Sequence, residues 1–484
     1  MVDVPFTTFA FRATTGTTTR TMPNRLDDVF NVKDFGAAGN GSADDRAAIQ
    51  AAADAAMAKQ GAILFFPPGI YHITASITFA GNTHGGIKIL GSGGAGDSQG
   101  ASCVIQGSFR DYLFKFTYPG GVVAEPLHSI QDLQFHQQFN IGTSQVDCVD
   151  TAGCIFIPGG IGPRIYGCSM YIQGGGVALY SLAQNMGIYS CNCLGPYFGT
   201  NATQSIGFMG QNLTVSDCKI YALGYGIVAS AGINASFTTI NNIDFEEIGT
   251  PISIGAFPIQ VLANVSPGTG GGGTLVGPFG GVHGGSAISR ATVITNINVE
   301  APGDYDGSSQ GVIFLSNTVY GAFLSGIFIY ADHAVIPGGA QGVTPPYGIR
   351  LEGGINCFIT CVDIAGSSGT AGGLTHAAYS MISSHGITFH GCRGTNSHTG
   401  GVVWDYLSNS FGAGDNGITW QNCDTDGALP KASLPPSPVA FGQTMVCSDA
   451  TQAFSPTNVG AAIVGGGTHK VLARWNGVAW TYAG

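Results

Sequence analysis

One four-residue pattern recurs along most of this chain, and it limits the fold more strongly than any other feature of the sequence. Each copy consists of an apolar residue, two residues that are mostly small or polar, and then Cys, Ile or Leu. The copies begin at Ile130, Ile165, Ile188, Val215, Ile240, Ile294, Leu324, Phe358, Phe389 and Trp420. Most of them start 23 to 35 residues after the one before, a spacing typical of a solenoid or a propeller.

Among repeat folds, a parallel β-helix agrees best with this pattern. Propeller blades need roughly 40 residues or more, and the Leu/Asn pattern of leucine-rich repeats is absent. Short apolar stretches separated by Gly and Asn, with one similar residue in each repeat, predict short strands that stack coil upon coil. We therefore expect an all-β fold in which the last residue of each copy points inward and forms a ladder.

The cysteines fall largely on that ladder. Twelve are present, and six of them close a copy of the pattern: Cys168, Cys191, Cys218, Cys361, Cys392 and Cys423. A buried thiol is a small apolar side chain, so we interpret these residues as packing groups rather than disulfide partners. A metal site is the rival interpretation, but the sequence has no Cys-x-x-Cys pair. We expect neither a metal nor another cofactor.

The charge content of the chain bears on its partners. Charged residues make up only 9% of the sequence and the mean hydropathy is +0.23, values that would suit a membrane protein. Gly, Thr, Ser and Asn nevertheless interrupt every apolar run before it reaches the ~18 residues of a spanning helix, so we expect no membrane insertion. The net charge is −11 and the 17 basic residues are scattered, which argues against nucleic acid and mildly against a strongly anionic substrate.

The pattern is preceded by a segment of different character. Ser42 is expected to cap an alanine-rich helix over about 44–59, with Asp44 and Asp45 at its positive end and Gly61 ending it. An apolar strand over 62–66 and a Pro-Pro-Gly turn follow.

Two stretches of this segment, 31–45 (NVKDFGAAGNGSADD) and 63–71 (ILFFPPGIY), together with the helix between them, carry a resemblance. They resemble the N-terminal module of the pectate-lyase-like superfamily. The resemblance implies a right-handed single-stranded parallel β-helix whose N-terminal end is capped by the α-helix. That superfamily includes lyases, glycoside hydrolases, epimerases and non-catalytic receptor binders, so the module indicates the fold rather than the reaction.

The N-terminal residues favour one branch of that superfamily. Residues 1–28 are Thr-rich, and no basic region followed by an apolar core, as in a secretory signal, is visible. In this the chain is similar to a bacteriophage tailspike or depolymerase. The resemblance implies a homotrimer that recognises a bacterial surface glycan, is located in the virion tail and contacts a baseplate or tail protein through its N-terminal arm. A chain of bacterial origin would instead be expected outside the cell, exported without a visible signal.

These observations predict four regions. They are an arm over 1–28, a cap over 29–80, a β-helix body over 81–448 and a small C-terminal β unit over 449–484. In the last region Trp475 and Trp480 are expected to cover the open end of the helix. The gap between Ile240 and Ile294 contains a glycine-dominated run over 268–285, and it represents either one coil with a long excursion or two coils.

Alternation along each strand predicts which side chains point outward. Residues one and three after the ladder residue face solvent: Lys219 and Tyr221, Asp244 and Glu246, Asn298 and Glu300, and Phe328 and Tyr330. The segments 240–246 (INNIDFE) and 294–300 (ITNINVE) are close repeats, so Glu246 and Glu300 are expected in one column. Adjacent coils would place them roughly 5 Å apart, and an intervening coil about 10 Å apart.

Such a column could hydrolyse a glycosidic bond. A carboxylate pair at about 5–5.5 Å suits a retaining glycosidase, and one at about 6.5–9.5 Å suits an inverting one. We assign catalysis to Glu246, Glu300 and Asp244. We assign polysaccharide binding to Tyr221, Lys219, Asn298, Tyr330 and Asp332, because the tyrosines can stack on the apolar faces of sugar rings. The alternative is that these groups are ordinary solvated surface charges.

Two other functions compete with hydrolysis. A receptor-binding protein would use the same face to hold a glycan without cutting it. A polysaccharide lyase would need a cation to neutralise a uronate, and Lys219 is the only basic residue on this face, so we rank it lower. The segment 304–307 (DYDG) begins like a calcium loop but lacks the later ligands, which favours a plain turn.

Overall fold

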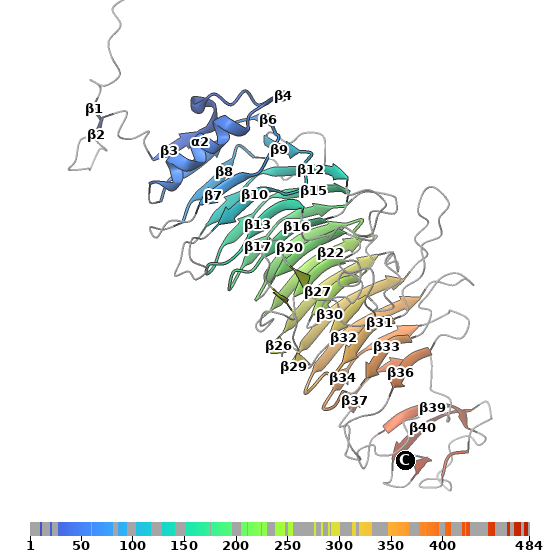
Figure 1. Cartoon of the computed structure of the whole chain (residues 1–484). Coiled ribbons are helices and arrows are strands. Elements are labelled where there is room, and N and C mark those ends of the chain that lie inside the picture. Colours follow the sequence, from blue (N-terminus) through green and yellow to red (C-terminus); the bar gives the residue numbers. More distant parts are fainter. Residues whose placement is uncertain are drawn as a thin grey trace, which may run out of the picture. The chain divides into compact units, whose positions relative to one another are not determined.

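The computed structural model assigns most of its described residues to parallel strands (Figure 1). It describes residues 10–11, 20–21, 28–59, 61–80, 86–93, 103–117, 128–140, 152–174, 176–195, 205–210, 212–223, 225–229, 238–246, 250–254, 275–276, 282–283, 289–290, 292–300, 312–315, 319–331, 347–366, 377–382, 384–395, 402–407, 419–421, 423–425, 444–450, 462–464, 469–475 and 479–482. Two compact units divide the chain. The first comprises 1–140, 152–173 and 178–192, and the second comprises 141–151, 174–177 and 193–484.

Each coil of the first unit contributes one strand to each of three faces. One coil contains β5 (Ile63–Phe66), β6 (Gly69–Ile73) and β7 (Ile77–Ala80), and the next contains β8 (Lys88–Gly91), β9 (Cys103–Gly107) and β10 (Tyr112–Thr117). β5 pairs with β8, β6 with β9 and β7 with β10, all in parallel. The same three-strand coil recurs in β11 (Ser129–Gln131), β12 (Gln134–Asn140) and β13 (Gly153–Ile157).

Like residues stack inside these coils. Ile89, Ile130, Ile165 and Ile188 are register partners from β8, β11, β14 (Arg164–Tyr166) and β17 (Gly187–Tyr189). Each is at most 1% exposed, and burial of such a side chain contributes about 1.5–3 kcal/mol. The last residues of the three copies that begin at Ile130, Ile165 and Ile188 are Leu133, Cys168 and Cys191, which are also fully buried, as the inward ladder predicted from the sequence requires.

The N-terminal helix differs from its prediction at both ends. The helix α2 runs over Arg46–Met57 rather than 44–59, and Ser42 does not cap it. The backbone N–H and hydroxyl of Ser42 instead donate to Oδ1 of Asn40, within β4 (Asn40–Asp44). The Asp44 carboxylate accepts from the backbone N–H of Arg46 and thereby serves the start of the helix.

The carboxylate of Asp45 has a different role. It is 2% exposed and accepts hydrogen bonds from the backbone N–H groups of Ala38 and Gly39 at 2.6 and 3.1 Å. Asp45 therefore ties the start of α2 to the turn before β4 rather than to the helix's own amides.

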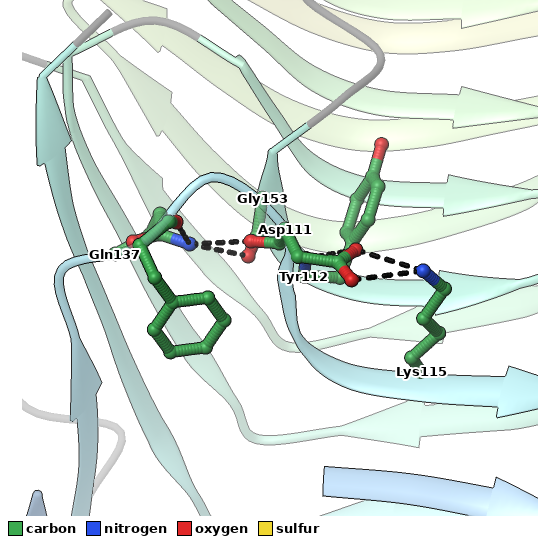
Figure 2. Close-up of polar contacts among 6 residues, drawn as sticks. Asp111, Tyr112, Lys115, Gln137 and Gly153 are labelled. Carbon is green, nitrogen blue, oxygen red and sulfur yellow. Dashed lines mark hydrogen bonds and ion pairs between the residues drawn. The ribbon is translucent and has the colours of Figure 1, made fainter. Parts of the chain in front are cut away.

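A buried glutamine of β12 makes hydrogen bonds to backbone groups next to β10 and at the start of β13 (Figure 2). Gln137 is fully buried, and its Nε2 donates to the carbonyl oxygens of Phe109, Asp111 and Gly153 at 3.3, 2.7 and 3.3 Å. Its amide thus links the turn before β10 to the first residue of β13. Beside it, the Asp111 carboxylate pairs with Lys115 at 2.8 Å.

Coils in the second unit merge two short strands into one long, bent strand. The strands β20 (Thr214–Tyr221), β22 (Thr239–Glu246), β27 (Val293–Glu300), β30 (Phe323–Ala331) and β32 (Phe358–Gly366) pair in this order and in parallel. Each strand bends at one residue with positive φ: Asp217, Asn242, Asn296, Gly326 and Cys361. The bend divides every strand into two arms, so one long strand covers two faces of a coil.

The pairing of β22 with β27 decides between the two interpretations of the gap between Ile240 and Ile294. Ile240 and Ile294 are direct register partners, so no coil lies between them. The gap is one coil with a long excursion, and the described part of that excursion includes the antiparallel pair β24 (Leu275–Val276) and β25 (Val282–His283).

The register corrects the eighth copy of the pattern. Ile359, not Phe358, pairs with Leu324, and Val362, not Cys361, pairs with Ile327. Cys361 occupies the bend instead, at φ 52°, and its side chain is exposed. The shift arises because Phe358 and Ile359 are both apolar, so the pattern permits either to be the inward residue.

The other described cysteines agree with their interpretation as packing groups. Nine besides Cys361 are free of disulfides, and eight of these nine are buried. Burial raises the pKa of the Cys103 thiol to about 12, and it raises the pKa of Cys154 and Cys168 as well.

The C-terminal part changes from parallel to antiparallel pairing. β39 (Thr444–Ala450), β40 (His469–Trp475) and β41 (Trp480–Tyr482) form a three-stranded sheet in which Trp475 and Trp480 are register partners. The fold is therefore a right-handed single-stranded parallel β-helix with an N-terminal capping helix and a small C-terminal β unit. Within the described ranges, no helix has the length and apolar character that crossing a membrane requires.

The corrected register can be checked with a thiol reagent. We expect the native protein to lose one reactive thiol when Cys361 is changed to Ser, because Cys361 is exposed, and none when buried Cys392 is changed to Ser. Titration with Ellman's reagent before and after denaturation measures both counts. Unchanged labelling in C361S would restore the register in which Cys361 points inward.

His128 predicts an acid-sensitive fold. It is 1% exposed, accepts a hydrogen bond at Nδ1 from the backbone N–H of Ile87, and packs against Phe116. Burial lowers the pKa of His128 from 6.5 to about 4. Since the unfolded chain binds the proton more readily, the contribution of His128 to stability is complete above about pH 6.5 and is lost as the pH falls towards 4.

The loss amounts to at most about 3 kcal/mol. Thermal unfolding measured from pH 8 to pH 4 should show a steeper decline for the native protein than for His128→Gln, which has no proton to gain. Parallel curves for the two proteins would contradict the assignment.

Candidate functional site

The outward residues of the second unit's long strands form columns across successive coils. Lys219, Asp244, Asn298 and Phe328 are consecutive register partners in one column, and Tyr221, Glu246, Glu300 and Tyr330 are consecutive partners in the other. The structure thus aligns seven of the eight residues predicted to act on a glycan. The eighth, Asp332, lies outside the described residues, as does the segment 304–307.

Glu246 and Glu300 are exposed and lie on adjacent coils. Adjacent strands are about 4.8 Å apart, so the two backbones lie at the shorter of the two spacings considered from the sequence. Both residues end their strands, β22 and β27, which places the carboxylates at the edge of the second arm.

Asn298 connects the acidic residues of the two columns. Its Nδ2 donates to Oδ1 of Asp244 at 2.9 Å and lies 3.5 Å from Oε1 of Glu300. One amide group therefore positions two carboxylates from different coils. The sequence predicted Asn298 as a binding residue, and this bridging role follows only from the register.

At one end of the columns, Lys219 and Tyr221 interact with each other. Partial burial raises the pKa of Tyr221, the positive charge of Lys219 and its hydrogen bond oppose that rise, and the carboxylates of Asp244 and Glu246 add to it. The Lys219 ammonium is therefore engaged with the tyrosine hydroxyl at the border of the acidic group.

At the other end, aromatic rings are exposed. The side chains of Phe328 and Tyr330 are 41% and 38% exposed, and their rings are 6.5 Å apart at an interplanar angle of 5°. On the first arm of the same sheet, Phe323 and Phe358 stack at 5.9 Å and 7° with similar exposure. Only Tyr330 among these four had been predicted to contact a glycan. Alternation identified Phe328 as outward, but exposed apolar rings have no sequence signature of their own.

Polar side chains also stack at the bends. Nδ2 of Asn242 donates to Oδ1 of Asp217 at 2.7 Å, and Oγ of Ser216 donates to Oδ2 of Asp217 at 2.8 Å. These hydrogen bonds lower the pKa of Asp217. Asn and Asp tolerate positive φ better than other residues with a side chain, which explains why they occupy the bend. These hydrogen bonds lie at the bend that separates the two arms.

Comparisons with known proteins agree with the architecture. Residues 29–265 match the family model "Rhamnogalacturonase A/epimerase, pectate lyase-like". Two mannuronan C5-epimerases of Azotobacter vinelandii are similar over short segments. AlgE6 is 57% identical over 47 residues, which is 10% of this chain and 5% of the relative, and AlgE4 is 45% identical over 83 residues, which is 16% of this chain and 14% of the relative.

Among solved structures, the Dettilon tailspike protein superimposes with a TM-score of 0.54 at 13% identity, over 94% of this chain and 78% of the other. At that identity the likeness concerns the fold alone. Residues 29–265 therefore carry a pectate-lyase-like module, and the fold of the chain, a right-handed β-helix, resembles that of a tailspike protein.

The bridging geometry of Asn298 can be tested by stability alone. Asn298→Asp places a third carboxylate between Asp244 and Glu300 and should lower the free energy of unfolding by about 1 kcal/mol at pH 7.5. The loss should shrink at pH 4, where carboxylates begin to bind protons. Asn298→Ala, which removes the amide without adding charge, should show no such recovery. Denaturant unfolding at both pH values distinguishes the two variants, and equal losses at both pH values in N298D would argue against the bridge.

Proposed function

We propose that this protein binds a bacterial surface polysaccharide across the columns of the second unit and hydrolyses its glycosidic bonds with Glu246 and Glu300. The observation that carries the proposal is the order along one column: tyrosine, glutamate, glutamate, tyrosine. A sugar chain along the column would have an aromatic ring under it on either side of a carboxylate pair.

The adjacency of the two glutamates supports a retaining mechanism, which needs carboxyl groups about 5–5.5 Å apart. In the first step one glutamate would protonate the glycosidic oxygen while the other attacks the anomeric carbon. The bond to the leaving sugar breaks and a covalent glycosyl-enzyme forms. In the second step the first glutamate removes a proton from water. The water attacks the same carbon, and the bond between that carbon and the second glutamate breaks.

The contacts of Asn298 support a division of roles. A nucleophile must be held in line with the carbon that it attacks, and Oε1 of Glu300 lies 3.5 Å from the Asn298 amide. We therefore assign the nucleophile to Glu300 and the acid/base to Glu246, with Asn298 and Asp244 as positioning residues.

Glycan binding without cleavage is the second candidate, because the exposed rings of Phe328 and Tyr330 would hold sugars whatever the carboxylates do. A lyase is less well supported, because Lys219 is engaged with Tyr221 rather than placed to neutralise a uronate. For either glycan function, the likeness in fold to a tailspike supports a homotrimer in a virion tail, joined to a baseplate or tail protein through residues 1–28.

The test is cleavage of bacterial polysaccharides by the full chain and by two variants. We expect Glu246→Gln and Glu300→Gln each to lower the release of new reducing ends by about 10²–10⁴-fold, because each removes one partner of the acid/base and nucleophile pair. Glycan affinity and oligomeric state should stay unchanged in both variants, since neither residue is buried.

Asp363→Asn is the matched control, because it removes a carboxylate from the same sheet outside the proposed pair and should leave cleavage intact. Full activity of both glutamine variants would eliminate this site. An increase in ultraviolet absorbance from an unsaturated uronate would replace hydrolysis with lyase chemistry, and affinity without new reducing ends would leave the binding function alone.

A further inference from the structure

We infer that the glycan held by these columns is a neutral polysaccharide, without uronate, sialate or phosphate groups, and that Phe328 and Tyr330 form the platform on which its sugar rings lie. This inference rests on the proposed function and adds the substrate class of the same site. It is argued from charge, from the geometry of the two rings and from what could otherwise cover them.

The charge of the sheet opposes an anionic ligand. The strands β20, β22, β27, β30 and β32 contain five carboxylates and one cation. The carboxylates are Asp217, Asp244, Glu246, Glu300 and Asp363, and the cation is Lys219. Three of the carboxylates lie on two adjacent coils, next to the platform. A polymer with one negative charge per repeat would meet this excess along its whole length, and like charges at such distances repel within the Debye length of about 8 Å.

The single cation of these strands lies at the opposite end of the columns from the platform. Lys219 lies three coils before Phe328 in the same column, and its ammonium interacts with the Tyr221 hydroxyl. Arg393, on the coil after β32, is the register partner of Asp363 rather than of a platform residue. Neither cation therefore faces the site between Glu300 and Tyr330.

The two rings provide a surface suited to sugars. Phe328 and Tyr330 are two residues apart on one strand, so both point outward, and their planes are parallel to within 5°. Each leaves more than a third of its surface in solvent. The next residue in the Tyr330 column is Ala365, which is too small to cover the tyrosine ring. A pyranose presents a face of C–H groups, and the exposed surfaces of the two rings offer it apolar contact.

A second protein surface would fit this site poorly. Covering the platform with a flat protein interface would also bury Asp244, Glu246 and Glu300, and ionised carboxylates removed from water without partners are costly. The hydroxyl groups of a neutral sugar remove that difficulty, because each can donate a hydrogen bond to a carboxylate. Exposed aromatic rings beside several carboxylates therefore favour a ligand that is apolar on its faces and has many hydrogen-bond donors at its edges.

The experiment measures binding of the full-length Glu300→Gln variant to neutral and acidic bacterial polysaccharides, with mannuronan included as a uniformly acidic probe. Each acidic polymer is also tested after chemical reduction of its carboxyl groups to alcohols. We expect binding to at least one neutral polymer, little change in its affinity between 50 and 500 mM salt, and no loss of affinity when an acidic polymer is reduced. Binding confined to unreduced acidic polymers, or no binding to any neutral one, would overturn the inference.

The platform is tested separately. Phe328→Ala and Tyr330→Ala should each weaken neutral-glycan binding by about tenfold, since each removes an apolar ring from under a sugar. Phe323→Ala is the matched control, because it removes an equally exposed ring from the same strand on the other arm, and it should leave affinity unchanged. An equal loss in all three variants would mean that the platform has no special role.

The outcomes separate this inference from the proposed function. Cleavage of an acidic polymer by the native protein, lost in E300Q, would retain hydrolysis and overturn the neutral substrate. Platform-dependent binding of a neutral polymer that is never cleaved would retain the inference and overturn hydrolysis.

Discussion

Parallel hydrogen bonding between consecutive coils is the interaction on which the rest of this structure depends. It places each residue directly over its register partner, at a spacing of about 4.8 Å that the backbone sets. The same pairing therefore builds two kinds of column at once. Inward residues such as Ile240 and Ile294 form the buried ladder, and outward residues such as Glu246 and Glu300 form the surface site. A slip of one residue would exchange the two, because side chains alternate along a strand.

Burial makes that register robust. Ile240, Ile294 and Leu324 are fully buried, and turning them to solvent would cost several times the stability that any surface pair contributes. The surface can therefore carry groups that repel one another. Crowded carboxylates and exposed aromatic rings do not favour folding, but here the core holds them in place. The outward side chains therefore need not stabilise the fold, and they can be suited to binding a ligand.

The bend at positive φ links core and site in a second way. Asp217, Asn242 and Asn296 occupy equivalent positions on successive coils, and their side chains take part in hydrogen bonds between coils or within the bend. The bend gives each strand two arms with different surfaces. The first arm carries hydroxyl and aromatic groups such as Ser325 and Phe323, and the second carries the acidic columns. One continuous strand thus presents two surfaces of different chemistry.

By itself, the sequence determined the architecture and the composition of the acidic face. The period of the Ile-x-x-Cys pattern required stacked coils, and the near-identity of 240–246 and 294–300 aligned Glu246 with Glu300 because equal sequences adopt equal registers. Only the tertiary structure decided that those two coils touch, since a gap of 54 residues is compatible with either one coil or two. It also moved Cys361 from the ladder to the bend, because adjacent apolar residues leave the inward position ambiguous until the pairing with Leu324 and Ile327 selects it. The tertiary structure also decided the platform of Phe328 and Tyr330 and the bridge by Asn298. The platform depends on the orientation of two rings and the bridge on a contact between strands, and a linear pattern encodes neither.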